Sequence, residues 1–246
     1  MKRILFVIVS ILLWIYFIIS SFVLLPLAVL ARSAGFIFDK KLKGIHYFTC
    51  FWGVMLAFVN PLWRVKVKGK GRRRRGQAYV VICNHQSLAD IMVLYKLFFH
   101  FRWVAKIELF STPILGWVMQ MNNYVKIRRG SRQSAEIMIN ECVRLLKSNI
   151  SVMIFPEGTR SPDGRLQHFK EGAFRIAKMA NCPILPVVIH GTANAIPKGS
   201  IFLKEQSLIT LEVLDPIPAD VIQAEEIKDT IVRTRKMYEE YVSRTN

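Results

Sequence analysis

A histidine and an aspartate lie five residues apart at the point where an apolar, β-branched run ends. Residues 79–83 have the composition of a buried strand, and a second apolar stretch begins near Leu88, which predicts a strand, a loop and then a helix. Because His85 falls in the loop and Asp90 in the first helical turn, the carboxylate can reach the Nδ1–H of the ring. That contact would fix the tautomer and leave Nε2 free to accept a proton. On spacing alone, an ordinary loop histidine beside a helix N-terminal acid is the commoner explanation.

The sequence around this pair offers no evident nucleophile. Ser87 and Cys83 are close to His85, but neither lies in the G-x-S-x-G turn that exposes a catalytic serine. The simplest chemistry is therefore a base that activates a hydroxyl group of the substrate. Two other classes stay open: a lipid hydrolase with Cys83 or Ser87 as nucleophile, and a scaffold that binds anionic lipid without catalysis.

A second polar cluster follows another predicted strand, in the sequence MIFPEGTRSPDG. Gly158 permits a positive φ or a close approach of backbone amides to a ligand. Thr159 offers a hydroxyl, and Arg160 offers a planar fork that suits a phosphate. Glu157 would repel a phosphate, so we assign it to holding an arginine or a substrate hydroxyl. The alternative is a strand that exits into a turn at residues 161–164, with Arg160 in solvent.

Cations also stand at the ends of two further predicted strands. Lys106 closes one apolar strand beside Glu108. The other strand end is crowded with Lys126, Arg128, Arg129 and Arg132. If these cations lie together at one edge of the sheet, they suit a phosphate-bearing ligand. Each of them alone would be interpreted as ordinary surface charge.

Short β-rich stretches alternate with helical ones beyond residue 76, which predicts an α/β fold with a mixed, largely parallel sheet flanked by helices. The predicted strands are 78–83, 101–106, 123–127, 151–156, 183–189 and 207–214. The predicted helices are 88–99, 113–121, 132–148, 170–180 and 220–243. Loops at the carboxyl edge of such a sheet are the usual position of ligands, which is where the polar clusters fall.

The N-terminal part of the chain predicts a hydrophobic membrane helix pair. Residues 4–30 carry no charge, and about 20 such residues span a bilayer. Residues 45–59 form a shorter apolar segment after a basic connector, which favours a hairpin in one leaflet, or one span followed by an interfacial helix. A cleaved signal peptide is the alternative, but its apolar core would be shorter. We therefore divide the chain into a membrane-anchoring helical segment, 1–62, and an α/β domain, 63–246.

The formal net charge of +18 is combined with 52% hydrophobic residues, which is unusual for a soluble enzyme. The basic stretch 64–75 would attract an anionic leaflet, or would simply be a solvated loop. No recognition helix, zinc spacing or aromatic RNA-binding signature is present, so we expect no nucleic-acid partner. The cysteines and histidines are scattered, which predicts reduced thiols on the cytosolic side and no metal site.

The pair NHQSLAD and FPEGTRS, in this order, resembles the motifs of the glycerolipid acyltransferase family. The resemblance extends over residues 63–214, and it is greatest to members that acylate 1-acylglycerol-3-phosphate. It implies transfer of an acyl group from acyl-CoA or acyl carrier protein to the sn-2 hydroxyl of lysophosphatidic acid, giving phosphatidic acid. Glycerol-3-phosphate or another lysophospholipid is the alternative acceptor. It further implies no cofactor beyond the acyl donor, and a bacterial-type inner-membrane enzyme facing the cytoplasm.

The resemblance assigns roles to matching positions only. His85 would be the general base, with Asp90 as its partner. The glycerol-phosphate site would comprise Glu157, Gly158, Thr159 and Arg160, with further contacts from Lys106 and Arg129. The block around Arg129 departs from the family pattern at Asn123, Lys126 and Arg128, so its contacts and the preferred head group depend on those changes.

Overall fold

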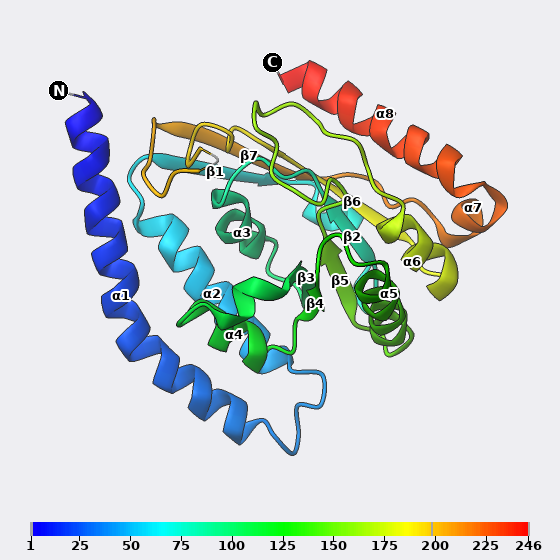
Figure 1. Ribbon diagram of the computed structural model, residues 1–246, viewed down its shortest axis with the longest axis horizontal. Coiled ribbons are helices and arrows are strands. Elements are labelled where there is room, and N and C mark those ends of the chain that lie inside the picture. Colours follow the sequence, from blue (N-terminus) through cyan, green and yellow to red (C-terminus); the bar gives the residue numbers. More distant parts are fainter. Residues whose placement is uncertain (1, 198, 246) are drawn as a thin grey trace.

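A seven-stranded sheet forms the centre of the molecule, and the computed structural model describes residues 2–197 and 199–245. The strands are β1 (Trp63–Lys68), β2 (Val80–Cys83), β3 (Phe101–Lys106), β4 (Val125–Ile127), β5 (Ser151–Ile154), β6 (Ile184–His190) and β7 (Ser207–Val213). Their order is β1-β7-β6-β2-β5-β3-β4. Strands β6, β2, β5, β3 and β4 are parallel, whereas β7 is antiparallel to β6 and parallel to β1. The predicted mixed, largely parallel sheet is confirmed (Figure 1).

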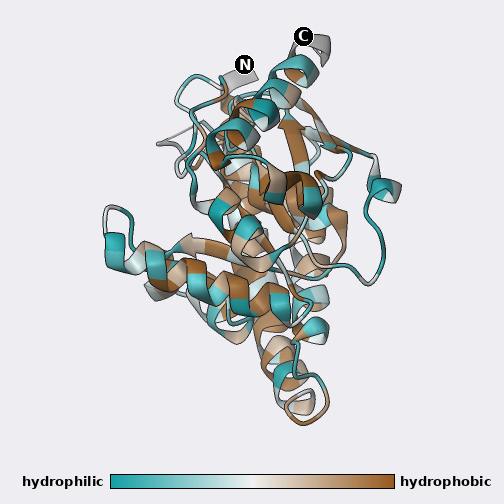
Figure 2. Ribbon diagram, turned by 90° about the vertical axis from the view of Figure 1, so that its right-hand side faces the viewer, coloured by the Kyte–Doolittle hydropathy of each residue, from teal (hydrophilic) through white to brown (hydrophobic). Residues whose placement is uncertain are grey.

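Helices cover both faces of the sheet (Figure 1). They are α1 (Lys2–Ala34), α2 (Lys43–Val59), α3 (Ala89–Leu94), α4 (Leu115–Met121), α5 (Arg132–Lys147), α6 (Gly172–Ala180), α7 (Ala219–Ala224) and α8 (Ile227–Thr245). Short 3-10 helices are η1 (Lys70–Arg72), η2 (Tyr95–Leu97) and η3 (Ile107–Ser111). In Figure 2 the central strands are hydrophobic, whereas the helices on the outside alternate hydrophobic and hydrophilic turns.

The sequence of β2 is continuously apolar because of the position of this strand in the sheet. Its side chains alternate between two cores: Val81 and Cys83 pack on the side of α2 and α3, and Val80 and Ile82 pack on the side of α5, α6 and α8. A strand in the middle of a sheet that is covered on both faces has no solvent side, so every residue is apolar. The loop that leaves β2 is therefore held by a rigid base.

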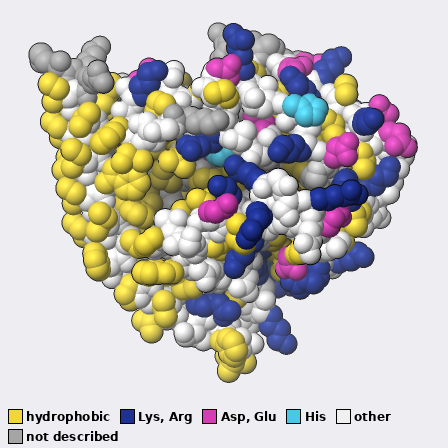
Figure 3. All heavy atoms as spheres, in the orientation of Figure 1, with side chains coloured by type: hydrophobic (Ala, Val, Ile, Leu, Met, Phe, Trp, Pro, Cys, Tyr) yellow, Lys and Arg dark blue, Asp and Glu magenta, His cyan; other side chains and the backbone are white. Residues whose placement is uncertain are grey.

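The N-terminal helices lie on one side of the sheet and carry much exposed apolar surface. In α1, the segment Ile4–Ala34 is long and apolar enough to cross a membrane. Helix α2 is apolar but has 17 residues, and its Trp52 ring stacks on Phe17 of α1 with centroids 6.3 Å apart. The indole N–H of Trp14 donates to the carbonyl of Ile201 at 3.1 Å, which fixes α1 to the loop before β7. Figure 3 shows the resulting apolar face, bordered by Lys and Arg side chains.

The main difference from the predicted elements is β1. We predicted no strand in this basic part of the chain. Trp63, Val65 and Val67 alternate with cations and pack on the core, while the cations point away. This alternation is the signal of a half-buried edge strand. The predicted helix 220–243 is in fact two helices, α7 and α8. The predicted strand 151–156 ends at Ile154, so the polar loop begins two residues earlier.

Candidate active site

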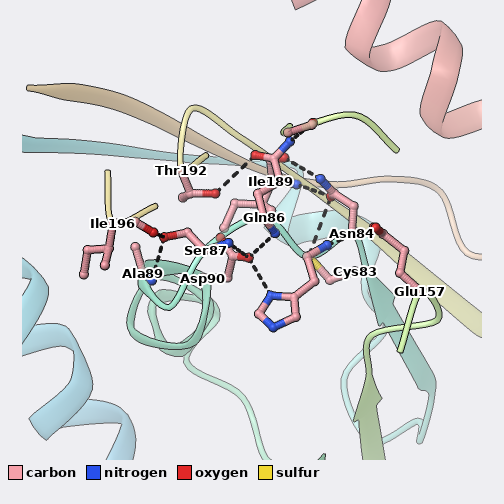
Figure 4. Close-up of polar contacts among 12 residues, drawn as sticks. Cys83, Asn84, Gln86, Ser87, Ala89, Asp90, Glu157, Ile189, Thr192 and Ile196 are labelled. Carbon is pink, nitrogen blue, oxygen red and sulfur yellow. Dashed lines mark hydrogen bonds and ion pairs between the residues drawn. The ribbon is translucent and has the colours of Figure 1, made fainter. Parts of the chain in front are cut away.

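The loop between β2 and α3 is anchored at its first residue. The side chain of Asn84 continues the strand pairing, because its Nδ2 donates to the carbonyl of Ile189 and its Oδ1 accepts from the Ile189 N–H, both at 2.8 Å. Figure 4 draws these bonds beside those of Asp90 and Glu157. A side chain that replaces a backbone partner ends the ladder between β2 and β6 without leaving buried groups unpaired. His85 follows at a fixed position.

His85 and Asp90 form the contact that their spacing predicts. His85 Nδ1 lies 2.8 Å from Asp90 Oδ2, and the aspartate side chain is fully buried, whereas the histidine side chain is 11% exposed. The same Oδ2 accepts the backbone N–H groups of Gln86 at 2.7 Å and Ser87 at 2.9 Å. An oxygen that accepts two N–H groups is an acceptor toward the ring as well, so Nδ1 carries the hydrogen and Nε2 has a free lone pair. The catalytic role of the pair stays a prediction.

The loop after β5 is tied to the histidine loop through backbone groups. Glu157 Oε1 accepts the His85 N–H at 2.9 Å, and Oε2 accepts the Gln167 N–H at 3.2 Å. In return, the Ser161 N–H donates to the His85 carbonyl at 2.8 Å. Glu157 is buried, and burial raises the pKa of its carboxyl group to about 7. The structure thus gives Glu157 two backbone partners, where we had assigned it to an arginine or a substrate hydroxyl.

An aromatic stack supports the imidazole from one side. The His85 ring lies parallel to the Phe155 ring, with centroids 3.9 Å apart and planes at 12°. Phe155 stacks in turn on Trp103 at 5.5 Å and 26°. Face-to-face aromatic contact restricts rotation of the imidazole and excludes water from one of its faces. The sequence contains these rings, but their mutual stacking depends on the packing of β3 against β5.

The backbone of Arg160 lies next to that of His85. Its neighbour Ser161 is bonded to the His85 backbone, so the two loops are adjacent. Arg160 is half-buried and Thr159 is exposed. Gly158 has φ +71°, a conformation that favours glycine.

Lys170 adds a cation that the sequence patterns do not indicate. A Cβ atom at position 158 would lie 2.9 Å from Lys170 Nζ, so the ammonium lies over the Gly158 backbone. The Lys170 N–H donates to the Pro156 carbonyl at 2.9 Å, which holds this segment against the loop. No local pattern in the sequence indicates this approach, because it results from the fold of residues 161–171.

The remaining predicted cations stand farther along the same edge of the sheet. Lys106 ends β3, which is two strands from β2, and Arg129 follows β4, which is three strands away. With about 5 Å between strands, their backbones lie roughly 10 and 15 Å from the start of the His85 loop. Lys106 is 41% exposed and lies 3.5 Å from Glu108, and Arg129 is exposed. Lys106 is thus the nearer of the two candidates for a phosphate contact.

Neither candidate nucleophile of the hydrolase alternative is placed for attack. Cys83 is fully buried, and burial raises its thiol pKa well above the usual value. Ser87 is fully buried, and its Oγ donates to the Ile196 carbonyl at 2.8 Å while accepting the Ala89 N–H at 3.2 Å. Both groups serve the loop structure. Among residues 2–197 and 199–245, no cluster of three or more His, Cys, Asp or Glu could hold a metal ion.

Comparison with protein families gives one match, in which residues 64–190 fit the family model described as Acyltransferase. A chloroplastic 1-acyl-sn-glycerol-3-phosphate acyltransferase of Brassica napus is 33% identical over 184 residues, covering 74% of this chain and 53% of the relative. A chloroplastic counterpart from Arabidopsis thaliana is 32% identical, covering 83% and 58%. The 1-acyl-sn-glycerol-3-phosphate acyltransferase of Saccharomyces cerevisiae is 33% identical, covering 76% and 64%. This chain therefore spans between about half and two thirds of these relatives.

The fold is also found in a solved structure. The crystal structure of the 1-acyl-sn-glycerophosphate acyltransferase PlsC from Thermotoga maritima aligns with a TM-score of 0.79 and 24% sequence identity. The alignment covers 100% of this chain and 98% of that one. At this identity the likeness concerns the fold, including the N-terminal helices.

Proposed function

The chain belongs to the acyltransferase family, and from this premise we propose that it transfers a fatty acyl group from a thioester to the sn-2 hydroxyl of lysophosphatidic acid. The product would be phosphatidic acid. The observation that carries the proposal is the bond between His85 Nδ1 and the buried Asp90 carboxylate at 2.8 Å, beside a loop with Arg160 and Lys170. A base and a phosphate site next to each other fit an acceptor that carries both a hydroxyl and a phosphate.

The reaction follows from the state of the imidazole. His85 Nε2 takes the proton of the sn-2 hydroxyl as its oxygen attacks the thioester carbonyl, and the C–S bond then breaks. The proton passes from Nε2 to the departing thiolate, so the histidine is restored. Asp90 holds the tautomer and stabilises the imidazolium that forms in between. General-base assistance of this kind is typically worth about 10²–10⁴ in rate, and a thioester is sufficiently activated to need no cofactor besides the donor.

The phosphate of the acceptor would lie against the loop after β5. Arg160 supplies a fork for two phosphate oxygens, Lys170 a point charge over Gly158, and Lys106 a more distant cation. Thr159 is exposed beside them and offers a hydroxyl. Arg129 stays a candidate for the outer part of this site. Fixing the phosphate orients the glycerol hydroxyl beside the imidazole, which removes much of the entropic part of the barrier.

The lipid substrate and product explain why such an enzyme would be attached to a membrane. We propose that α1 and α2 hold the chain in the bilayer, supported by the apolar length of Ile4–Ala34 and the exposed apolar face. The inner membrane, with the catalytic loops on the cytoplasmic side, suits either acyl-CoA or acyl carrier protein as donor. The basic residues of β1 and η1 would attract the anionic leaflet.

The test is to incubate the purified full chain with each donor and each acceptor. The donors are labelled oleoyl-CoA and oleoyl-acyl carrier protein, and the acceptors are lysophosphatidic acid, glycerol-3-phosphate and lysophosphatidylcholine. We expect labelled phosphatidic acid from lysophosphatidic acid, and release of the label by phospholipase A2, which cleaves at sn-2. Label in another lipid would show that the protein uses a different acceptor, and release of free fatty acid alone would show hydrolysis instead of transfer.

Variants assign the roles within this reaction. We expect His85→Ala to lower kcat by about 10²–10⁴ with little change in KM. Arg160→Ala should raise the KM of the phospho-acceptor far more than that of the thioester, and Lys106→Ala should act in the same direction but less. Arg74→Ala is a matched control, because it removes an exposed arginine between β1 and β2, at the opposite edge of the sheet. Equal effects of Arg160→Ala on both KM values would contradict the phosphate site.

A further inference from the structure

A pocket that contains an arginine lies away from the catalytic loops, between the end of α1 and the end of α4. It has a volume of about 540 Å³ and is lined by Arg32, Ser33, Phe36, Gln120 and Met121. It is open to solvent along one side, so a ligand bound there would be partly exposed. Its lining includes a guanidinium and a hydroxyl as well as a phenyl ring and a thioether, so the pocket is both cationic and apolar.

The guanidinium in this pocket lacks an anion. Arg32 is half-buried, and its side chain makes no ion pair or hydrogen bond with the residues that the structure describes. A half-buried guanidinium that pairs with no described residue is available to an anionic group from outside the described chain.

A buried arginine near Arg32 increases the local positive charge. Arg102 is 4% exposed, and it donates to the carbonyls of Asn122 (2.5 Å), Asn123 (2.9 Å) and Lys41 (3.2 Å) rather than to a carboxylate. Burial is the main cause that lowers the pKa of Arg102, and the charge of Arg32 contributes to the same shift. The two guanidinium groups are therefore within electrostatic reach of each other.

One acid stands near this charge and is outnumbered by cations: Asp39 lines a small void together with Arg32. Asp39 is the one acidic residue between α1 and α2. Its carboxylate oxygens accept the backbone N–H groups of Lys43 at 2.9 Å and Gly44 at 2.6 Å, which caps the first turn of α2. Lys40, Lys41 and Lys43 add further cations to the same connector. An anion in the pocket would meet a net positive field.

The pocket is distinct from the catalytic site but continuous with the apolar face. Arg102 stands at the start of β3 and Lys106 at its end, about 13 Å apart along the strand, and the catalytic loops follow the strand ends. Phe36 lines the pocket, and Phe38 of the connector and Trp117 of α4 are exposed apolar side chains of the neighbouring segments. A ligand in this position needs an anionic group for Arg32 and hydrocarbon for these side chains.

We propose that this pocket binds the head group of an anionic membrane phospholipid, with Arg32 on its phosphate and its acyl chains along the exposed apolar side chains of α1 and α4. Such a lipid would be bound by the protein in addition to the substrate. It would join α1 to α4 and neutralise the charge at the connector.

Native mass spectrometry of the full chain in detergent tests this binding directly. Dioleoyl phosphatidylglycerol is titrated against wild type and Arg32→Gln, with Lys147→Gln as a matched control on the far side of the sheet. Loss of a charge-assisted bond predicts an affinity about tenfold weaker in Arg32→Gln and unchanged in the control. Arg32→Lys, which keeps the charge and loses the fork, should bind with intermediate affinity, and it serves as the test if the glutamine variant does not fold.

Further measurements distinguish a lipid head group from free phosphate, and the pocket at Arg32 from the site at Arg160. Inorganic phosphate should bind far more weakly than phosphatidylglycerol, and Arg160→Ala should leave the Arg32-dependent binding intact. Acyl transfer in neutral detergent should be unchanged in Arg32→Gln, and the lipid titration is read out without reference to that activity. The proposal is overturned if Arg32→Gln binds phosphatidylglycerol like wild type, if inorganic phosphate binds equally well, or if Arg160→Ala abolishes the binding.

Discussion

Replacing Glu157 by alanine tests the idea that this carboxylate positions His85 instead of contacting substrate. The substitution removes the acceptor of two backbone N–H groups, His85 N at 2.9 Å and Gln167 N at 3.2 Å. Each buried donor left without a partner costs about 1–3 kcal/mol, so the free energy of unfolding should fall by about 3 kcal/mol. For a chain of this size, that corresponds to a decrease in Tm of about 9 °C. The comparison is best made at pH 5, where the carboxyl group is protonated and burial does not penalise it.

The catalytic consequence is larger than the loss of stability. Without Glu157, the His85 backbone keeps only its bond from Ser161 on this side, and the ring can shift from its position beside the acceptor. A displacement of about 1 Å costs about 10²-fold in rate, so kcat for lysophosphatidic acid should fall by that factor with little change in KM. The assay is thiol release from the acyl donor, at temperatures where both proteins are folded by circular dichroism. If Glu157→Ala keeps its kcat and raises only the KM of the acceptor, then the carboxylate contacts substrate and our reasoning about the loop is wrong.

Three further predictions concern the same loops. Because burial raises the pKa of Glu157 from 4.5 to about 7, its contribution to stability is fully present below pH 4.5 and is lost as pH rises through 7. Between pH 4.5 and pH 8, the free energy of unfolding should therefore fall by about 3 kcal/mol more in wild type than in Glu157→Gln. Equal decreases in the two proteins would refute this prediction. Phe155→Leu removes the ring whose centroid lies 3.9 Å from that of His85 and should lower kcat about tenfold, whereas Phe155→Tyr, which keeps the ring, should retain activity. Loss of activity in both variants would count against a role of the stack. Cys83→Ala should keep acyl-transfer activity, because the thiol is buried and protonated. A folded but inactive variant would instead support the hydrolase alternative, in which Cys83 is the nucleophile.

Local patterns predicted the parts of the structure that depend on neighbouring residues. The alternation of apolar strands and helices predicted the α/β sheet, and the gap between His85 and Asp90 predicted their contact because both lie within one loop and one helical turn. The ends of β3 and β5 were placed at one edge of the sheet by the same logic. Strand β1 was missed because its lysines and arginines dominate the composition, although Val65 and Val67 alternate with them.

Features that depend on distant backbone groups could not be predicted. The sequence indicates that Glu157 is close to a phosphate-type loop, but not that its oxygens accept N–H groups from residues 72 positions before and 10 positions after it. The approach of Lys170 to Gly158 and the stack of Phe155 between His85 and Trp103 also result from tertiary packing. In each case the residue type was visible and its partner was not.

The hydroxyl of Tyr238 shows how far along the chain the support of β2 extends. This side chain comes from α8, is fully buried, and lies 2.9 Å from the Ile82 carbonyl of β2, while it accepts the Val187 N–H of β6 at 3.2 Å. One phenol from the last helix thus bridges two strands a short distance before the polar loop begins. Because Tyr238 follows Ile82 by 156 positions, the strand that carries the histidine can acquire this bridge only after residue 238 has been synthesised.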